Sequence, residues 1–186
     1  MTLATWLTLA RIAMIVPFVA ASWIEAPVLA ALIFAVAGLT DWADGYVARK
    51  RNEVSALGAA LDPIADKLLT ITALLVLCGS DVINGIHLLA ALAIALREVL
   101  VGGLREALAG RSAGLPVTFL AKIKTTVQFV AFVVLIASGG TGHLGGSGPV
   151  GMTGLALLWV AAVLTVWTGY QYVDKAVRVL TGAAPR

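Results

Sequence analysis

Four aspartates in the N-terminal half of the sequence have the type and spacing needed to bind metal ions. Asp41 and Asp44 are three residues apart, and Asp62 and Asp66 are four residues apart. On a helix, each spacing puts both members of a pair on one face. Clustered carboxylates repel each other at low dielectric constant unless cations neutralise them, and oxygen ligands prefer hard ions. The four aspartates therefore predict a site for Mg²⁺ or Mn²⁺, with two ions expected.

A structural interpretation of these acids is the alternative, in which Arg49 and Lys67 pair with them as salt bridges. Buried ion pairs rarely require four acids, so metal binding is favoured. Small residues lie between and beside the aspartates and leave room for a bulky ligand close to the backbone. They are Gly45, Ala48 and Gly58.

The elements that carry these aspartates are predicted to be transmembrane helices, because the whole chain is apolar. It is 60% hydrophobic and 12% charged, with a mean hydropathy of +0.98, which excludes an ordinary soluble domain. A run of roughly 20 apolar residues crosses the bilayer core as a helix. We predict an all-α, polytopic integral membrane protein, a single domain over residues 1–186. Its six expected transmembrane helices span about residues 3–23, 26–46, 57–78, 86–108, 115–137 and 150–172.

The second and third predicted helices are antiparallel neighbours joined by a short turn over residues 50–56, so their charged ends meet. Each pair of aspartates lies near this turn, and the four carboxylates are expected to converge there. Pro63, just inside the third helix, removes a backbone donor and predicts a bend beside the site. The metal site should therefore lie near one membrane surface.

The basic residues predict which surface that is. The segments expected at the other surface, residues 22–27, 79–87 and 138–149, contain no Lys or Arg, so all 13 basic residues lie on or toward one side. Positive charge is enriched on the cytoplasmic side, which places the aspartates at the cytoplasmic face of the inner (plasma) membrane. Anionic lipids account for the net charge of +3, and no nucleic-acid partner is predicted.

The segment from Asp41 to Asp66 resembles the signature of the CDP-alcohol phosphatidyltransferase family. It reads Asp-x2-Asp-Gly-x2-Ala-Arg-x8-Gly-x3-Asp-x3-Asp, with eight fixed positions over 26 residues. The resemblance implies a six-helix membrane enzyme that transfers a phosphatidyl or related group from a CDP-linked lipid to an alcohol and releases CMP. It also implies that Asp41, Asp44 and Asp62 bind metal, and that Asp66 lies beside the metals and accepts the proton of the attacking hydroxyl.

The resemblance also implies residues that contact the lipid donor, CDP-diacylglycerol. They are Gly45, Ala48, Arg49, Ser55 and Gly58, although Ser55 can equally be an ordinary loop serine. Thr5-x2-Thr8-x2-Arg11 is similar to a segment that family members write as Asn-x-x-Thr-x-x-x-x-x-Arg, but Thr2 stands where the asparagine is expected. Thr8 is therefore a further candidate for the donor, and Arg11 either contacts it or snorkels to the membrane surface.

The acceptor alcohol is predicted from charged residues in the second half of the chain. Arg97 and Glu98 lie well inside the fourth predicted helix, and Glu98 shares a face with Arg105. Lys122 and Lys124 point to nearly opposite sides of the fifth helix, so one of them can enter a pocket while the other reaches lipid phosphates. A pocket of Arg97, Arg105, Lys122 and Lys124 suits an acceptor that bears phosphate. These segments resemble the branch of the family whose acceptor is glycerol 3-phosphate.

Two other functions are compatible with the sequence. The same enzyme class with another acceptor is the first, such as phosphatidylglycerol in cardiolipin synthesis or inositol phosphate. A cation transporter is a remote second, because the half of the membrane away from the motif offers only Glu25 and Asp81 as acidic residues. A homodimer is expected, because dimers are common in the family and small residues along the third to fifth helices permit close packing.

Overall fold

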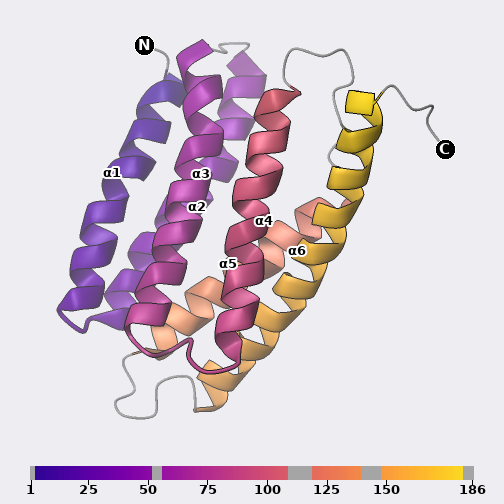
Figure 1. The fold of residues 1–186 in the computed structure, drawn as a ribbon. Coiled ribbons are helices and arrows are strands. Elements are labelled where there is room, and N and C mark those ends of the chain that lie inside the picture. The colour runs from indigo at the N-terminus through magenta and orange to yellow at the C-terminus, as the bar shows by residue number, and fades with distance from the viewer. Residues whose placement is uncertain (1–2, 52–55, 109–118, 140–147, 182–186) are drawn as a thin grey trace.

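The structure is a computed structural model, and it describes residues 3–51, 56–108, 119–139 and 148–181. Side chains are described within these ranges except at residues 3–4, 41–51, 56–57, 59 and 119. The described residues form six helices and no strand: α1 Leu3–Trp23, α2 Pro27–Arg51, α3 Ala56–Gly79, α4 His87–Ala107, α5 Phe119–Ser138 and α6 Pro149–Thr181 (Figure 1). The all-α prediction is therefore confirmed for this part of the chain.

The helices follow the predicted spans closely, apart from the C-terminal ends of α2 and α6. The helix α2 continues to Arg51, five residues past its predicted boundary and into the segment predicted as a turn. The C-terminal end of α6 departs further. That helix continues to Thr181, nine residues past the predicted boundary, and at 33 residues it is about 50 Å long. The bilayer core is about 30 Å thick, so the last turns extend beyond it. Arg178 Nε donates to Asp174 Oδ2 at 3.0 Å, which stabilises these added turns. The helix α3 runs through Pro63 without a break.

Four of the described helices are long and apolar enough to cross a membrane: Thr5–Trp23, His87–Ala107, Leu120–Ser138 and Pro149–Thr181. In α2 the apolar part is the shorter run Pro27–Thr40, because the motif and its basic neighbours occupy the rest of the helix. The N-terminal part of α3 likewise carries two aspartates and a lysine. The structure therefore confirms an apolar helical protein, while the full count of six spans stays a prediction.

The helices pack through aromatic rings and small residues. The ring centroid of Phe34 in α2 lies 5.5 Å from that of Phe18 in α1 and 5.6 Å from that of Phe129 in α5. Phe129 also lies directly over Gly38, where any side chain would overlap its ring. Many large apolar side chains face outward, among them Val99, which is 66% exposed. Such a surface is stable in lipid, where outward apolar residues cost nothing.

The chain reverses direction after each helix, so both termini lie at one end of the bundle in Figure 1. At the other end, Glu25 and Asp81 adopt left-handed backbone conformations (φ 55° and 56°) in the turns after α1 and α3. There the indole Nε1 of Trp159 in α6 donates to His87 Nδ1 at the start of α4, at 3.0 Å. The C-terminal end of α2 and the N-terminal end of α3, which carry the motif, lie at the end that holds the termini.

Candidate active site

The helices α1 and α3 contact each other at the acidic motif. The hydroxyl of Thr8 donates to Asp62 Oδ1 at 3.0 Å, and Arg11 Nη1 lies 3.8 Å from the same oxygen. Thr8 and Arg11 are each 1% exposed, and Thr5 is equally buried on the same face of α1. The N-terminal segment that the sequence singled out therefore packs directly against the acidic motif.

This contact argues against a snorkelling Arg11, while contact of Arg11 with the lipid donor stays a prediction. A snorkelling arginine reaches the membrane surface, whereas the buried guanidinium of Arg11 lies beside a carboxylate that compensates its charge. Both contacts of Asp62 use Oδ1, and its side chain is 48% exposed. The second carboxylate oxygen is therefore available to a hard cation, which fits the predicted role of Asp62 as a metal ligand.

Asp66 lies one helical turn after Asp62, on the same face of α3, and its side chain is exposed. Its negative charge acts on the ammonium group of Lys124 in α5. One face of α3 therefore connects the acidic motif to the basic residues of the second half of the chain. This position suits a group that accepts a proton from a bound alcohol.

The rest of the motif is described only in part. The backbone of α2 is helical through Arg51, so Asp41 and Asp44 keep the helical spacing that the prediction requires. The side chains of five predicted site residues in α2 lie outside the described residues: Asp41, Asp44, Gly45, Ala48 and Arg49. Ser55 lies outside them entirely, and Gly58 is buried near the start of α3. The convergence of the four carboxylates and the contacts with the lipid donor stay predictions.

Two of the four predicted acceptor residues, Arg97 and Lys124, meet at Glu98. Its Oε1 accepts hydrogen bonds from Lys124 Nζ at 2.6 Å and from Arg97 Nη1 at 3.2 Å. The side chains of Arg97, Glu98 and Lys124 are 16%, 12% and 5% exposed. Two cations and one anion leave a net positive charge in a place with little water. Such a cluster attracts anions strongly.

The other two predicted acceptor residues lie apart from this cluster. Lys122 is exposed while Lys124 is buried, which confirms that the two lysines point to different sides of α5. Arg105 is also exposed, and its guanidinium carbon lies 5.8 Å from the ring centroid of Tyr172 in α6, within the range of a cation–π contact. The structure therefore brings Arg97 and Lys124 together but not Lys122.

Polar atoms beside the cluster were missed by the sequence analysis. Arg97 Nε, Gln128 Oε1 and Thr165 Oγ1 are buried and have no hydrogen-bond partner among the described residues. Gln128 follows Lys124 by four residues, and Thr165 precedes Gly169 by four, where a Cβ would lie 3.0 Å from Arg97 Cγ. The four-residue spacing of polar and small residues within apolar helices was the sequence signal that could have indicated these buried polar atoms. Buried unpaired polar atoms favour a polar ligand or water there.

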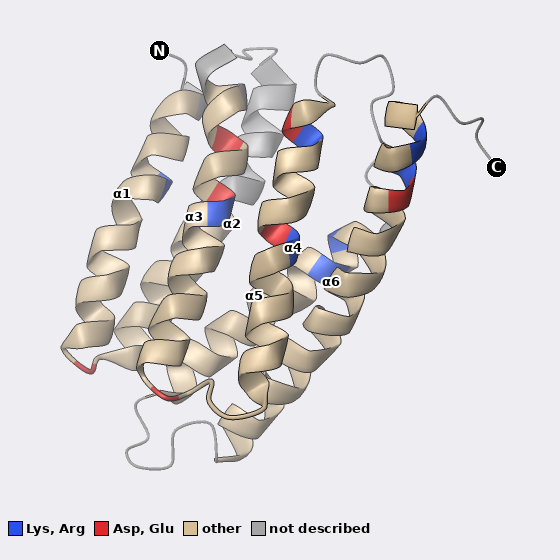
Figure 2. Cartoon of the chain, viewed as in Figure 1, with Lys and Arg blue, Asp and Glu red and all other residues tan. Residues whose placement is uncertain are grey.

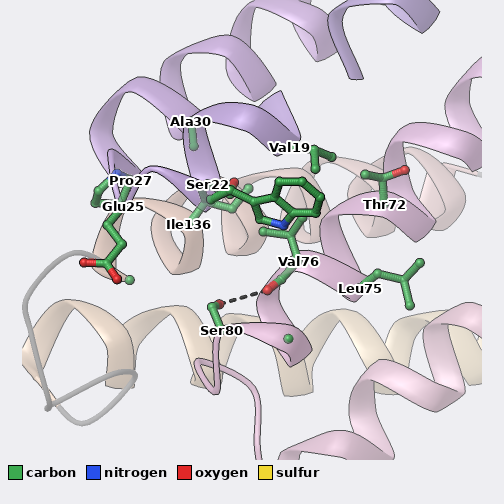
Figure 3. Close-up of a pocket in the computed structure, with 13 residues that line it drawn as sticks. Val19, Ser22, Glu25, Pro27, Ala30, Thr72, Leu75, Val76, Ser80 and Ile136 are labelled. Carbon is green, nitrogen blue, oxygen red and sulfur yellow. Dashed lines mark hydrogen bonds between the residues drawn. The ribbon is translucent and has the colours of Figure 1, made fainter. Parts of the chain in front are cut away.

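A cavity of about 870 Å³ lies at the opposite end of the bundle, between α1, α2, α3 and α5 (Figure 3). Its lining is largely apolar, with Trp23, Leu75 and Ile136 among the contributors. Polar groups are few, and one of them, the hydroxyl of Ser80, donates to the backbone carbonyl of Val76 at 2.9 Å. Since no predicted site residue lines it, this cavity is separate from the candidate active site.

Comparison with known proteins assigns the class. The family model for CDP-alcohol phosphatidyltransferase matches residues 1–167, and the chain belongs to this family. A relative from Rickettsia bellii is 42% identical over 177 aligned positions, which cover 91% of this chain and 92% of the relative. Relatives from Sodalis glossinidius and Yersinia enterocolitica are 39% and 36% identical and cover 95% of each chain. All three are named CDP-diacylglycerol–glycerol-3-phosphate 3-phosphatidyltransferase.

Proposed function

We propose that the chain transfers the phosphatidyl group of CDP-diacylglycerol to sn-glycerol 3-phosphate, giving phosphatidylglycerophosphate and CMP in phospholipid biosynthesis. One observation carries this function: relatives that have this reaction in their names match at least 91% of the chain. The buried cluster of Arg97, Glu98 and Lys124 agrees with it, because a net positive pocket favours an acceptor that carries phosphate over a neutral polyol.

The metal-binding part of the proposal rests on the aspartates. Asp41, Asp44, Asp62 and Asp66 would hold Mg²⁺ or Mn²⁺, with two ions bound. Ions held by these aspartates would supply positive charge for the diphosphate of the donor and for the departing CMP. The exposed carboxylate of Asp62, held through one oxygen by Thr8 and Arg11, supports this assignment.

Asp66 is the proton acceptor in this proposal. The oxygen of a primary hydroxyl of glycerol 3-phosphate forms a bond to the lipid-side phosphorus, and the bond from that phosphorus to the CMP oxygen breaks. CMP leaves with the bonding electrons, and the hydroxyl proton passes to Asp66. Glu98 orients Arg97 and Lys124, which hold the phosphate of the acceptor near this point.

The distribution of charge supports an active site that faces the cytoplasm. In Figure 2 the blue segments of Lys and Arg lie between the middle of the bundle and the end that holds the termini. Glu25 and Asp81 lie in the turns after α1 and α3, at the other end. A cytoplasmic face of the inner membrane gives the site access to a water-soluble acceptor and to a lipid donor. We further propose that the enzyme acts as a homodimer of six-span chains.

Release of CMP from purified protein tests the reaction. With CDP-diacylglycerol, glycerol 3-phosphate and Mg²⁺ we expect CMP and phosphatidylglycerophosphate, and Asp66→Asn should lower the rate by about 100-fold or more. A panel with phosphatidylglycerol or inositol phosphate as acceptor separates the related activities. The function is rejected if no CMP forms with glycerol 3-phosphate, or if Asp66→Asn keeps the wild-type rate.

Removal of metal tests the cofactor separately. We expect a chelator to stop CMP release, and added Mg²⁺ or Mn²⁺ to restore it, because only cations can relieve the repulsion among the carboxylates and the diphosphate. A chelator should also lower the midpoint of thermal unfolding of Asp41→Asn less than that of the wild type, since the variant binds metal more weakly. Full activity in excess chelator would contradict the metal dependence.

A further inference from the structure

A glycine of α4 leaves the space in which a lysine side chain of α3 packs. The side chain of Lys67 lies directly over Gly102, where a Cβ would overlap both its Cε and its Nζ atoms. The next residue, Gly103, has no atom within 4 Å of a Cβ placed there. Of these two glycines only Gly102 is closely approached, and the absence of a side chain there leaves room for the ammonium group of Lys67.

The ammonium group of Lys67 differs from that of Lys124 in its surroundings. Lys124 Nζ is bonded to Glu98 at 2.6 Å, whereas Lys67 forms no ion pair or hydrogen bond with any described residue. Lys67 is half-buried and lies next to Asp66 in the middle of α3, where the apolar C-terminal half of the helix begins. A cation in such a place is costly unless an anion binds to it.

The position of Gly102 links Lys67 to the acceptor cluster. Gly102 follows Glu98 by four residues and precedes Arg105 by three, so all three lie on one face of α4. Gly102, against which Lys67 packs, therefore lies one helical turn from Glu98, which binds Arg97 and Lys124. An acceptor bound near Asp66 would lie beside this face of α4.

We propose that Lys67 binds the phosphate group of the acceptor, and that Gly102 is a positioning residue that places the Lys67 ammonium group for this contact. The inference rests on the proposed function, since it names the residues that select glycerol 3-phosphate. A phosphate monoester carries nearly two negative charges at neutral pH, more than one ammonium group neutralises. Lys67 and the Glu98-bound cations share that charge and hold the acceptor hydroxyl near Asp66.

Steady-state kinetics of purified full-length variants test the proposal. Lys67→Met keeps most of the length of the side chain and removes its charge, and Gly102→Ala displaces the ammonium group. We expect both to raise the KM for glycerol 3-phosphate by roughly 10-fold to 100-fold, the loss of one charge-assisted contact. The KM for CDP-diacylglycerol should change by less than about threefold. Titration of each variant with glycerol 3-phosphate by calorimetry should show the same loss of affinity.

Two controls separate positioning from folding. Gly103→Ala makes the same chemical change one residue away in open space, and it should leave both KM values unchanged. In a Lys67→Ala background there is no long side chain to displace, so adding Gly102→Ala should have little further effect on the KM for glycerol 3-phosphate. If Gly102→Ala fails to fold, Lys67→Met alone still tests the phosphate contact.

Other results would overturn the inference while the proposed function stands. Wild-type turnover with glycerol 3-phosphate, together with an unchanged acceptor KM in Lys67→Met, would mean that the ammonium group only reaches the membrane surface. A rise confined to the KM for CDP-diacylglycerol would assign Lys67 to the donor diphosphate instead. Absence of wild-type turnover with glycerol 3-phosphate would reject the function itself, and this result differs from the other two.

Discussion

At the scale of single residues, Glu98 is the buried anion on which two cations depend. Its Oε1 accepts from both Arg97 and Lys124, and all three side chains are largely buried. Buried charges are stable only when they are paired and hydrogen-bonded. We therefore expect Glu98 to have two effects: it stabilises the fold, and it holds both cations at the proposed acceptor site.

Substitution of Glu98 tests this dependence. We expect Glu98→Gln to lower the free energy of unfolding by about 3 kcal/mol, because two cations then lose their shared counter-charge. Glu106→Gln, a matched change at an exposed position of the same helix, should alter it by less than about 0.5 kcal/mol. Thermal unfolding in detergent gives the comparison. Equal effects of the two substitutions would show that the cluster adds no stability.

At the scale of helices, close packing depends on particular glycines. Gly38 in α2 lies under the ring of Phe129 in α5, and a Cβ added at Gly154 in α6 would lie 2.8 Å from the side chain of Leu135. Lipid provides little hydrophobic drive between helices, so such close approaches supply the packing energy. The stack of Phe34 on Phe129 extends this contact into the core.

A substitution at Gly38 tests the α2–α5 contact. Gly38→Ala should destabilise the protein by about 1–3 kcal/mol, because the methyl group overlaps the ring of Phe129 and the core must shift. Combination with Phe129→Leu should recover part of this loss, since leucine can move away from the new methyl group. Unfolding in detergent measures both variants. If Phe129→Leu gives no recovery, then the ring is not the cause.

The sequence predicted the bounds of the helices better than the rotation of each helix about its own axis. Long apolar runs separated by polar turns define each span, so five of the six helices begin and end within a few residues of the expected bounds. The added turns of α6 were missed because Asp174 and Arg178 resemble solvent-exposed residues until their ion pair is seen. Rotation about each helix axis is harder to predict, because lipid-facing and buried surfaces are equally apolar.

Prediction of the candidate site from the sequence was limited in the same way: spacing along one helix was predicted, and contacts between helices were not. The spacing of Asp62 and Asp66 on one helical face was predicted correctly, and so was the divergence of Lys122 and Lys124. By contrast, the placement of Lys67 over Gly102 depends on the contact between α3 and α4, which no spacing within one helix encodes. Contacts between helices therefore supply what sequence periodicity cannot.

At the scale of the whole molecule, the arrangement of charge predicts the orientation in the membrane. Cys78 is the only cysteine, so Cys78→Ser provides a background for single-cysteine labelling. In that background we expect Asp81→Cys to react with a membrane-impermeant maleimide from the outside of intact cells. Lys175→Cys should react only after the membranes are opened, because the proposed topology places the basic end in the cytoplasm. The reverse pattern would invert the proposed topology.

The contact of α1 with Asp62 has a consequence for the order in which ligands arrive. In the proposed metal site, Arg11 would compete with a divalent ion for the charge of the Asp62 carboxylate, which would weaken binding of the ion before the donor arrives. The diphosphate of the nucleotide lipid adds the missing negative charge. We therefore expect the metal ion and the nucleotide lipid to bind together. The helix α1, which contains no carboxylate, would in this way determine the order of ligand binding.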